Sequence, residues 1–151
     1  MPKKASLEDV HHIHVLINAY AKRGLMLGRS LNYIYEKVRD FSVHKQRGKV
    51  LGCCALNIVG WQNLGEIKSL AVEKKYQKKG IGKSLVDACL KEAKVLGIKK
   101  VFVLTYEPAF FKKLGFKLIS KEKLPHKIWS DCLNCPEFPG CHEEALIKVI
   151  S

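Results

Sequence analysis

The sequence predicts an α+β domain in which helices flank a mixed, mostly antiparallel central sheet. Apolar residues recur at helical spacing near the N-terminus, over residues 7–22. Strand-like runs separated by short turns then follow one another between residues 41 and 72, as in antiparallel strands. From 65 to 105 a strand, a helix and a second strand succeed one another, which is the order of a parallel βαβ unit. At 151 residues the chain is long enough to bury one core, so we expect a single domain over residues 1–151.

Composition and charge indicate a globular protein with a basic surface. Hydrophobic residues make up 47% of the chain, charged residues 27%, and the formal net charge is +13. The lysines come in scattered pairs rather than in one basic block with interleaved aromatics, which favours a solvated surface over a nucleic-acid site. No apolar run approaches the ~20 residues that span a bilayer, and the polar N-terminal stretch lacks the apolar core of a signal peptide. We therefore expect a cytoplasmic protein without a membrane segment.

Two helices are expected near the N-terminus. Ser6 and Asp9 have the spacing of a capping box for the helix over 7–22, which should end near Gly24. Ser30 is placed to cap a second helix. The expected buried stripe of that second helix consists of Leu31, Ile34, Tyr35 and Val38.

The remaining elements alternate between strands and helices. We expect strands at 41–44, 49–59, 100–105, 116–119 and 145–150, a central strand ending at 72, and helices at 83–96 and 108–113. Gly97 should close the longer of these helices. Cys53 and Cys54 lie inside the second strand, so at least one of the two thiols should be buried.

The turn between the central strand and the next helix has the composition of an anion cradle. Gly80 and Gly82 let the backbone turn tightly and leave N–H groups unpaired where the helix begins, and these groups favour a phosphate. A P-loop would need glycine where this chain has Gln77, and a dinucleotide-binding loop would need glycine or alanine where it has Leu85. Together with the surrounding lysines, the cradle predicts a ligand that carries a diphosphate and that is bound by neither of these two loop types.

The spacing Gln77-x-x-Gly80-x-Gly82, directly after a strand that ends Leu70-Ala71-Val72, resembles the acetyl-CoA motif of the GCN5-related N-acetyltransferases. The resemblance implies the fold of that family and acetyl-CoA as co-substrate. The cofactor-binding residues that it implies are Leu70, Ala71, Val72, Gln77, Lys78, Lys79, Gly80, Ile81, Gly82, Lys83, Ser84 and Phe111. Many members carry a tyrosine at the position of Phe111 that protonates the leaving thiolate, which phenylalanine cannot do.

The run from Gly65 to Val72, the strand at 101–105 and the pair Arg29-Ser30 are similar to the acetyltransferase domain of the N-acetylglutamate synthases. This resemblance implies Glu66 as general base, Thr105 as general acid and Arg29 as a contact for a carboxylate of L-glutamate. It assigns Lys127 as a second substrate contact. It also implies the first step of arginine biosynthesis and is compatible with a homodimer.

Two alternatives to this reading stay open. The acceptor could be another small amine or amino acid, although a polycation would be repelled by the basic surface. The chain could also be a basic nucleic-acid- or ribosome-binding module on an idle acetyltransferase fold.

The loop at 125–142 is rich in cysteine. Cys132, Cys135 and Cys141, with His142, could fill a structural zinc site that pins the loop carrying Lys127. Free thiols are equally compatible with the pattern, because Cys141 and His142 are adjacent and awkward as two ligands of one ion.

Overall fold

The computed structural model describes residues 1–59, 63–121 and 143–150, and within these residues one mixed sheet forms the centre of the protein. The strand order is β1-β2-β3-β4-β5-β7-β6. Of the described strand pairs, β4 and β5 run parallel and the others run antiparallel. The strands are β1 Lys3–Lys4, β2 Phe41–Gln46, β3 Lys49–Val59, β4 Leu64–Val72, β5 Lys100–Thr105, β6 Lys117–Ile119 and β7 Glu144–Val149. The predicted α+β architecture is confirmed.

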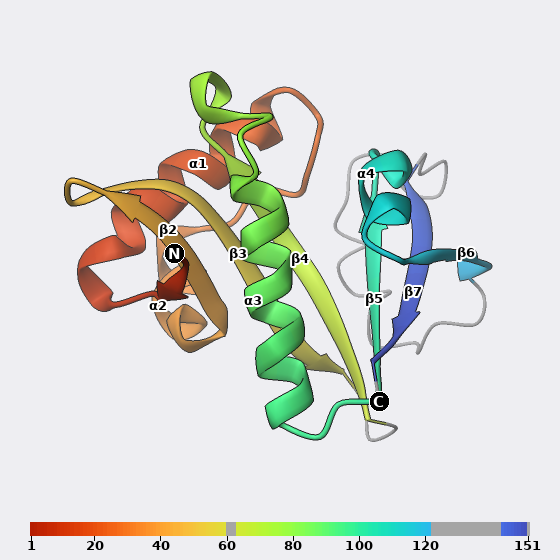
Figure 1. The fold of residues 1–151 in the computed structure, drawn as a ribbon. Coiled ribbons are helices and arrows are strands. Elements are labelled where there is room, and N and C mark those ends of the chain that lie inside the picture. The colour runs from red at the N-terminus through yellow and green to blue at the C-terminus, as the bar shows by residue number, and fades with distance from the viewer. Residues whose placement is uncertain (60–62, 122–142, 151) are drawn as a thin grey trace.

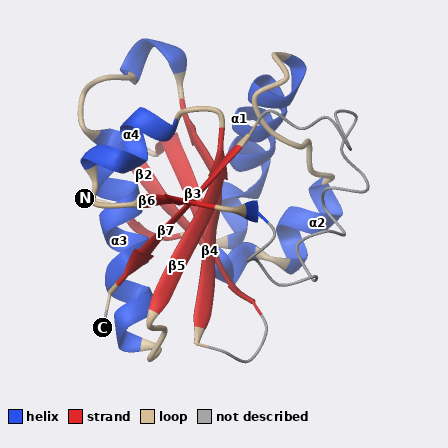
Figure 2. Cartoon of the chain, turned by 90° about the vertical axis from the view of Figure 1, so that its right-hand side faces the viewer, coloured by secondary structure: helices blue, strands red, loops and turns tan. Residues whose placement is uncertain are grey.

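Helices cover both faces of the sheet (Figure 2). Helices α1 (Val10–Lys22) and α2 (Leu31–Glu36) lie on one face, and α3 (Ile81–Val95) and α4 (Pro108–Lys113) lie on the other. Short 3₁₀ turns are found at Leu7–Asp9, Val38–Asp40 and Lys74–Tyr76. Within the described part of the chain, no helix is long and apolar enough to cross a membrane.

Because both faces are covered, the protein has a hydrophobic core on each side of the sheet. One core joins α3 and α4 to the sheet, and the other joins α1 and α2 to it. Cys53 and Cys54 are neighbours in β3 and point to opposite faces, so each enters a different core and both are fully buried. The prediction that at least one of these thiols is buried is confirmed.

The N-terminal elements follow the sequence closely. The capping box between Ser6 and Asp9 is formed, with the Ser6 N–H donating to Asp9 Oδ2 at 2.9 Å. The predicted N-cap Ser30 accepts a hydrogen bond from the Tyr33 N–H at 3.0 Å. The predicted burial of Tyr35 is wrong, since this side chain is 40% exposed. Helix α2 is rotated so that Tyr33 packs against the core instead.

Two further differences from the sequence prediction have a physical reason. Helix α3 begins at Ile81 rather than Lys83, because Gly80 adopts φ +84° and serves as the N-cap, so Gly82 lies inside the first helical turn. Strand β1 was not predicted. Its two exposed lysines carry no hydrophobic alternation, and the strand is defined by backbone pairing with Ser42 and Val43 of β2.

The sheet opens between its two parallel strands. β4 and β5 pair from Leu64 and Lys100 as far as Ile67 and Val103, after which the described pairing stops. Figure 1 shows the two strands together at one end and diverging toward the end where the α1–α2 loop and α4 lie. The residues of the predicted anion cradle and the candidate catalytic residues both lie around this opening.

Candidate active site

A cavity of about 840 Å³ occupies the opening between β4 and β5. Its walls come from the α1–α2 loop, the second half of β4, the turn before α3, and the segment that joins β5 to α4. Segments far apart in the sequence therefore meet around one volume. The volume lies within the usual range of roughly 300–1,000 Å³ for small-molecule sites.

A bulge in β4 shapes one wall of this cavity. Cys53 is paired with Ala71 and Ala55 with Lys68, so two residues, Ser69 and Leu70, oppose one residue of β3. Ser69 has φ +57°, a left-handed conformation that a non-glycine residue adopts at a cost. The bulge turns the β4 backbone away from the regular ladder at Leu70, one of the cofactor-binding residues that the resemblance implies.

The turn before α3 has the tight backbone conformation that the predicted anion cradle requires. Lys78 and Gly80 have positive φ values of +64° and +84°, which bend the chain sharply before α3. Helix geometry leaves the first N–H groups of α3 without an intrahelical acceptor, and they carry the positive end of the helix dipole. Ser84, by contrast, directs its hydroxyl to the Ile81 carbonyl at 2.9 Å. Ligand contacts in this turn are thus expected from the backbone rather than from Ser84.

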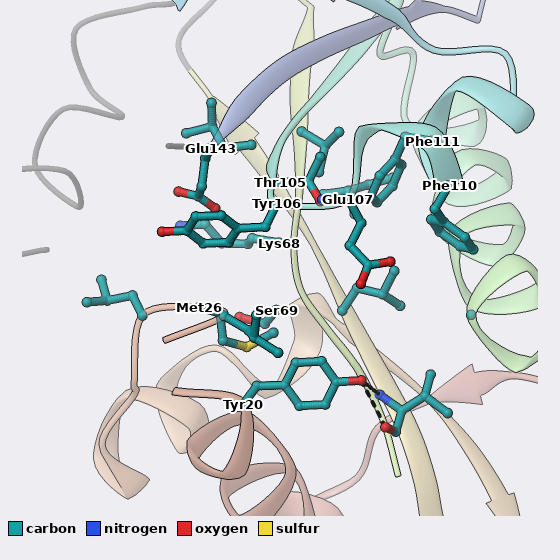
Figure 3. Close-up of a pocket in the computed structure, with 18 of the residues that line it drawn as sticks. Tyr20, Met26, Lys68, Ser69, Thr105, Tyr106, Glu107, Phe110, Phe111 and Glu143 are labelled. Carbon is teal, nitrogen blue, oxygen red and sulfur yellow. Dashed lines mark hydrogen bonds between the residues drawn. The ribbon is translucent and has the colours of Figure 1, made fainter. Parts of the chain in front are cut away.

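Tyr20 of α1 fixes the cradle to the end of β4. Its hydroxyl donates to the Val72 carbonyl at 2.9 Å and accepts from the Val72 N–H at 3.1 Å. The Gln77 side-chain amide donates to the same hydroxyl at 2.7 Å and to the Val72 carbonyl at 3.1 Å. Figure 3 shows Tyr20 on the cavity wall, and the dashed lines at its hydroxyl mark these two hydrogen bonds to the Val72 backbone. The side chain of Gln77 is therefore a structural tie within the cradle.

The candidate general base, Glu66, lines the cavity from β4 and is 6% exposed. Lys68 lies two residues further along the same strand, and its Nζ is 3.9 Å from Glu66 Oε1. Asn57 of β3, in the amide orientation that satisfies both of its neighbours, accepts from Lys68 Nζ at 3.2 Å. Glu66 is thus a buried carboxylate on the cavity wall with a cation beside it, and a carboxylate is one of the side chains that general base catalysis uses.

The candidate general acid, Thr105, ends β5 on the opposite wall. Its Oγ accepts a hydrogen bond from the Glu107 N–H at 2.9 Å, which orients the hydroxyl at the start of the loop into α4. Because that bond uses a lone pair, the hydroxyl proton stays available for donation. The structure places Thr105 and Glu66 around the same cavity.

Phe110 and Phe111 close the cofactor side of the cavity. Phe111 is 3% exposed and packs edge-on against Phe110 and Phe116, with ring centroids 5.0 and 5.3 Å apart. A Cβ on Gly82 would lie 3.4 Å from Phe110 Cζ, so the start of α3 and the start of α4 touch at this point. Phe111 contributes to the wall mainly as a core residue.

Arg29 lies on the acceptor side, in the loop between α1 and α2. Its guanidinium carbon is 4.5 Å from the centroid of the Tyr33 ring, a cation–π arrangement. The arginine is half-buried and lines the cavity together with Glu66 and Thr105. The described residues of the predicted catalytic and acceptor set thus surround one cavity.

The sequence analysis gave no role to several residues that line the cavity, among them Lys68, Tyr106, Glu107 and Glu143. Figure 3 shows Tyr106 and Lys68 close together in projection with Glu143 above them. The alternation of side chains along a strand could have identified Lys68 as a neighbour of Glu66 on the cavity side, because residues two apart on a strand share a face. Tyr106 and Glu107 are loop residues without such a signal.

The predicted metal ligands and one substrate contact cannot be placed. Lys127 and the candidates Cys132, Cys135 and Cys141 lie outside the described residues. Among residues 1–59, 63–121 and 143–150, no group of three or more histidine, cysteine or acidic side chains could hold a metal ion.

Comparison with known proteins gives consistent matches over the chain. A model of the acetyltransferase (GNAT) family matches residues 9–116. An uncharacterized N-acetyltransferase from Chlorobaculum tepidum is 43% identical over 98% of this chain and 95% of its own length. An amino-acid acetyltransferase from Mycobacterium tuberculosis is 36% identical over 85% of this chain and 75% of its own length.

A solved structure extends the match to the fold. N-acetylglutamate synthase from Neisseria gonorrhoeae, complexed with coenzyme A and N-acetyl-glutamate, superposes with a TM-score of 0.91 at 28% identity. The match covers 100% of this chain but 35% of that protein, so this chain spans about a third of the synthase.

Proposed function

Because this chain belongs to the GNAT family and is an acetyl-CoA-dependent amino-acid N-acetyltransferase, we propose that its acceptor is L-glutamate and its product N-acetyl-L-glutamate, made in the first step of arginine biosynthesis. One observation carries the proposal. A single cavity joins the diphosphate cradle, a buried carboxylate at Glu66 and a guanidinium at Arg29. We treat residues 1–151 as one catalytic domain.

Acetyl-CoA binds along the opening between β4 and β5. The cradle at Gly80–Gly82 holds the diphosphate through backbone N–H groups, and the acetyl end reaches the β4 bulge. There the Leu70 N–H stabilises the negative charge that develops on the thioester oxygen. The coenzyme thereby presents its carbonyl carbon to the acceptor side of the cavity.

Glutamate enters on the Arg29 side. The guanidinium takes one carboxylate in a bidentate pair, for which its planar fork is suited. Lys127, which lies outside the described residues, is the proposed second contact. This orientation directs the α-amine toward Glu66 and the thioester, so the two reactants are held together before the chemical step.

The transfer is direct. The α-ammonium of free glutamate is protonated at neutral pH and cannot attack until it loses a proton, which Glu66 removes. The amine attacks the carbonyl carbon, the C–N bond forms and the C–S bond breaks. Thr105 then donates its hydroxyl proton to the leaving thiolate and is reprotonated by the second proton that the acetylated nitrogen loses, so the amide forms and the threonine hydroxyl is restored. General base assistance of this kind contributes a factor of roughly 10² to 10⁴.

An acceptor series tests the substrate assignment. Thiol release from acetyl-CoA is measured with L-glutamate, L-glutamine, L-aspartate, L-lysine and spermidine, on the wild type and on Arg29→Met. Glutamate should lead, and Arg29→Met should raise its KM by a factor of about 10 to 100, the value of a charge-assisted hydrogen bond. Arg39→Met, at an exposed site in a 3₁₀ turn, is the matched control and should not change KM.

Two results would contradict the assignment. Faster turnover of lysine or spermidine would point to another amine as acceptor. Binding of acetyl-CoA without turnover of any acceptor would favour a binding module on the acetyltransferase fold.

A further inference from the structure

Two polar side chains of helix α1, Asn18 and Tyr20, project on opposite sides of the helix and bond to segments that line the cavity. Successive residues of an α-helix are about 100° apart, so residues two apart face about 200° away from each other. We propose that α1 positions the two substrate-binding segments separately. Asn18 holds the acceptor loop, residues 25–30, and Tyr20 holds the cofactor loop, residues 73–80. The acceptor part rests on the proposed role of Arg29.

Asn18 ties the acceptor loop to the helix. Its side-chain amide donates to the His14 carbonyl at 2.9 Å, one turn earlier in α1, and to the Arg29 carbonyl at 3.0 Å. The first bond fixes the amide on the helix surface, and the second fixes the backbone of the arginine. The rotamer of Asn18 therefore determines where Arg29 leaves the loop.

The loop is fitted closely to this side chain. A Cβ on Gly28 would lie 2.8 Å from Asn18 Oδ1, so only glycine lets the backbone approach the amide so nearly. Beyond Gly28, the Arg29 guanidinium stacks on Tyr33 of α2. The backbone of Arg29 is thus held from α1 and its head group from α2, which preorganises the arginine for a carboxylate.

Tyr20 performs the corresponding task for the cofactor loop. Val72 ends β4, beyond the last described pairing with β5, and both of its backbone polar groups bond to the Tyr20 hydroxyl. The Gln77 amide bonds to the same hydroxyl at 2.7 Å. One oxygen therefore joins the start and the middle of the turn that leads to Gly80.

The Tyr20 hydroxyl bonds to Val72 at the end of β4 and to Gln77 in the cofactor loop. The Asn18 amide bonds to His14 in its own helix and to Arg29 in the acceptor loop. Neither side chain belongs to the proposed chemistry at Glu66 and Thr105. Both are therefore positioning residues, and each should affect one substrate. A merely structural role would lower thermal stability without separating the two Michaelis constants.

The test compares Asn18→Ala with Tyr20→Phe in the full chain. Tyr20→Phe keeps the ring, including its contact with Arg23 at 5.0 Å, and removes only the hydroxyl. The matched controls are Asn32→Ala and Tyr35→Phe on α2. Asn32 bonds within its own helix to Glu36 at 3.0 Å, and Tyr35 is an exposed tyrosine. Acetyl-CoA affinity is measured by calorimetry and the acceptor KM by steady-state kinetics.

Tyr20→Phe should weaken acetyl-CoA binding by a factor of about 3 to 10, the usual worth of a hydrogen bond, and leave the acceptor KM within about twofold. Asn18→Ala should do the reverse, with an acceptor KM raised by a similar factor. In an Arg29→Met background Asn18→Ala should add nothing to the acceptor KM, because the asparagine acts through that arginine. The two controls should match the wild type in both constants.

Several outcomes would overturn the proposal. Equal changes in both constants would show that α1 acts through global stability, and tighter acetyl-CoA binding by Tyr20→Phe would show that the phenol obstructs the coenzyme. If glutamate is not turned over by the wild type, the proposed function fails while the calorimetry still decides the Tyr20 part. The Asn18 part is then measured with the acceptor that the wild type accepts, and without any such acceptor that part is rejected.

Discussion

Gly80 offers a test of the cradle in which conformational strain and ligand binding can be separated. It sits at the N-cap of α3 with φ +84°, and a Cβ built there meets no atom within 4 Å. Gly80→Ala therefore adds no clash. Its cost is the left-handed conformation itself, about 1–2 kcal/mol. In a domain of this size 1 kcal/mol corresponds to roughly 2–4 °C, so Tm should fall by about 2–8 °C.

Relief of this strain would also move the backbone N–H groups of the cradle. We expect Gly80→Ala to raise the KM for acetyl-CoA and to leave the KM for the acceptor unchanged. Gly48→Ala is the matched control, since Gly48 has φ +77° and equally open surroundings in the β2–β3 hairpin. It should lose comparable stability in thermal unfolding while keeping the acetyl-CoA KM. An unchanged Tm for Gly80→Ala, or a raised acetyl-CoA KM for Gly48→Ala, would refute the reasoning.

Two further predictions concern titratable groups away from the cavity. Burial raises the pKa of Asp9, but hydrogen bonds from Lys45 and Ser6 outweigh it and hold the value below the ordinary range. Asp9→Asn should therefore lower the unfolding free energy by about 2 kcal/mol at neutral pH. In urea titrations this difference should persist above pH ~4 and shrink below it, because a lowered native pKa stabilises only the ionised state. Burial raises the pKa of Cys53 to about 12, and the Cys89 hydrogen bond and burial raise that of Cys54. Iodoacetamide at pH 8 should leave both thiols unmodified in the native protein and should modify both in urea, as read out by peptide mapping. If either thiol of the native protein reacted as fast as an exposed thiol, the result would contradict their burial.

Much of the fold could be predicted because its determinants are local. Capping residues such as Ser6 and Ser30, the glycine at 97 and the alternating or continuous apolar runs each report on their own segment. The wrong predictions arise where contacts with other elements, rather than the local sequence, decide which side chain is buried. Tyr35 and Tyr33 have similar local patterns, and only the contact with Arg29 and the α1 side of the core selects Tyr33 for burial.

In the candidate site, too, local features could be predicted from the sequence and long-range contacts could not. The predicted cradle at Gly80 and Gly82 is a contiguous motif with a backbone mechanism, so the sequence was sufficient to predict the tight turn that the structure shows there. Tyr20 and Asn18 carry no motif. They sit on an amphipathic helix, and their roles come from partners 52 and 11 residues away in sequence. Long-range hydrogen bonds of this kind leave no periodic trace in a single sequence.

Direct acetyl transfer to the α-amine of glutamate with Glu66 as base is tested most directly by NMR of the reaction product. The product is formed from L-glutamate and acetyl-CoA labelled in the acetyl group, with the wild type and with Glu66→Gln. Glu36→Gln, on the exposed side of α2, serves as control. The wild type should form Nα-acetyl-L-glutamate, and kcat/KM should fall by a factor of roughly 10² to 10⁴ in Glu66→Gln alone. An unlabelled glutamate pool in the wild type, or a Glu66→Gln variant as active as the control, would contradict it.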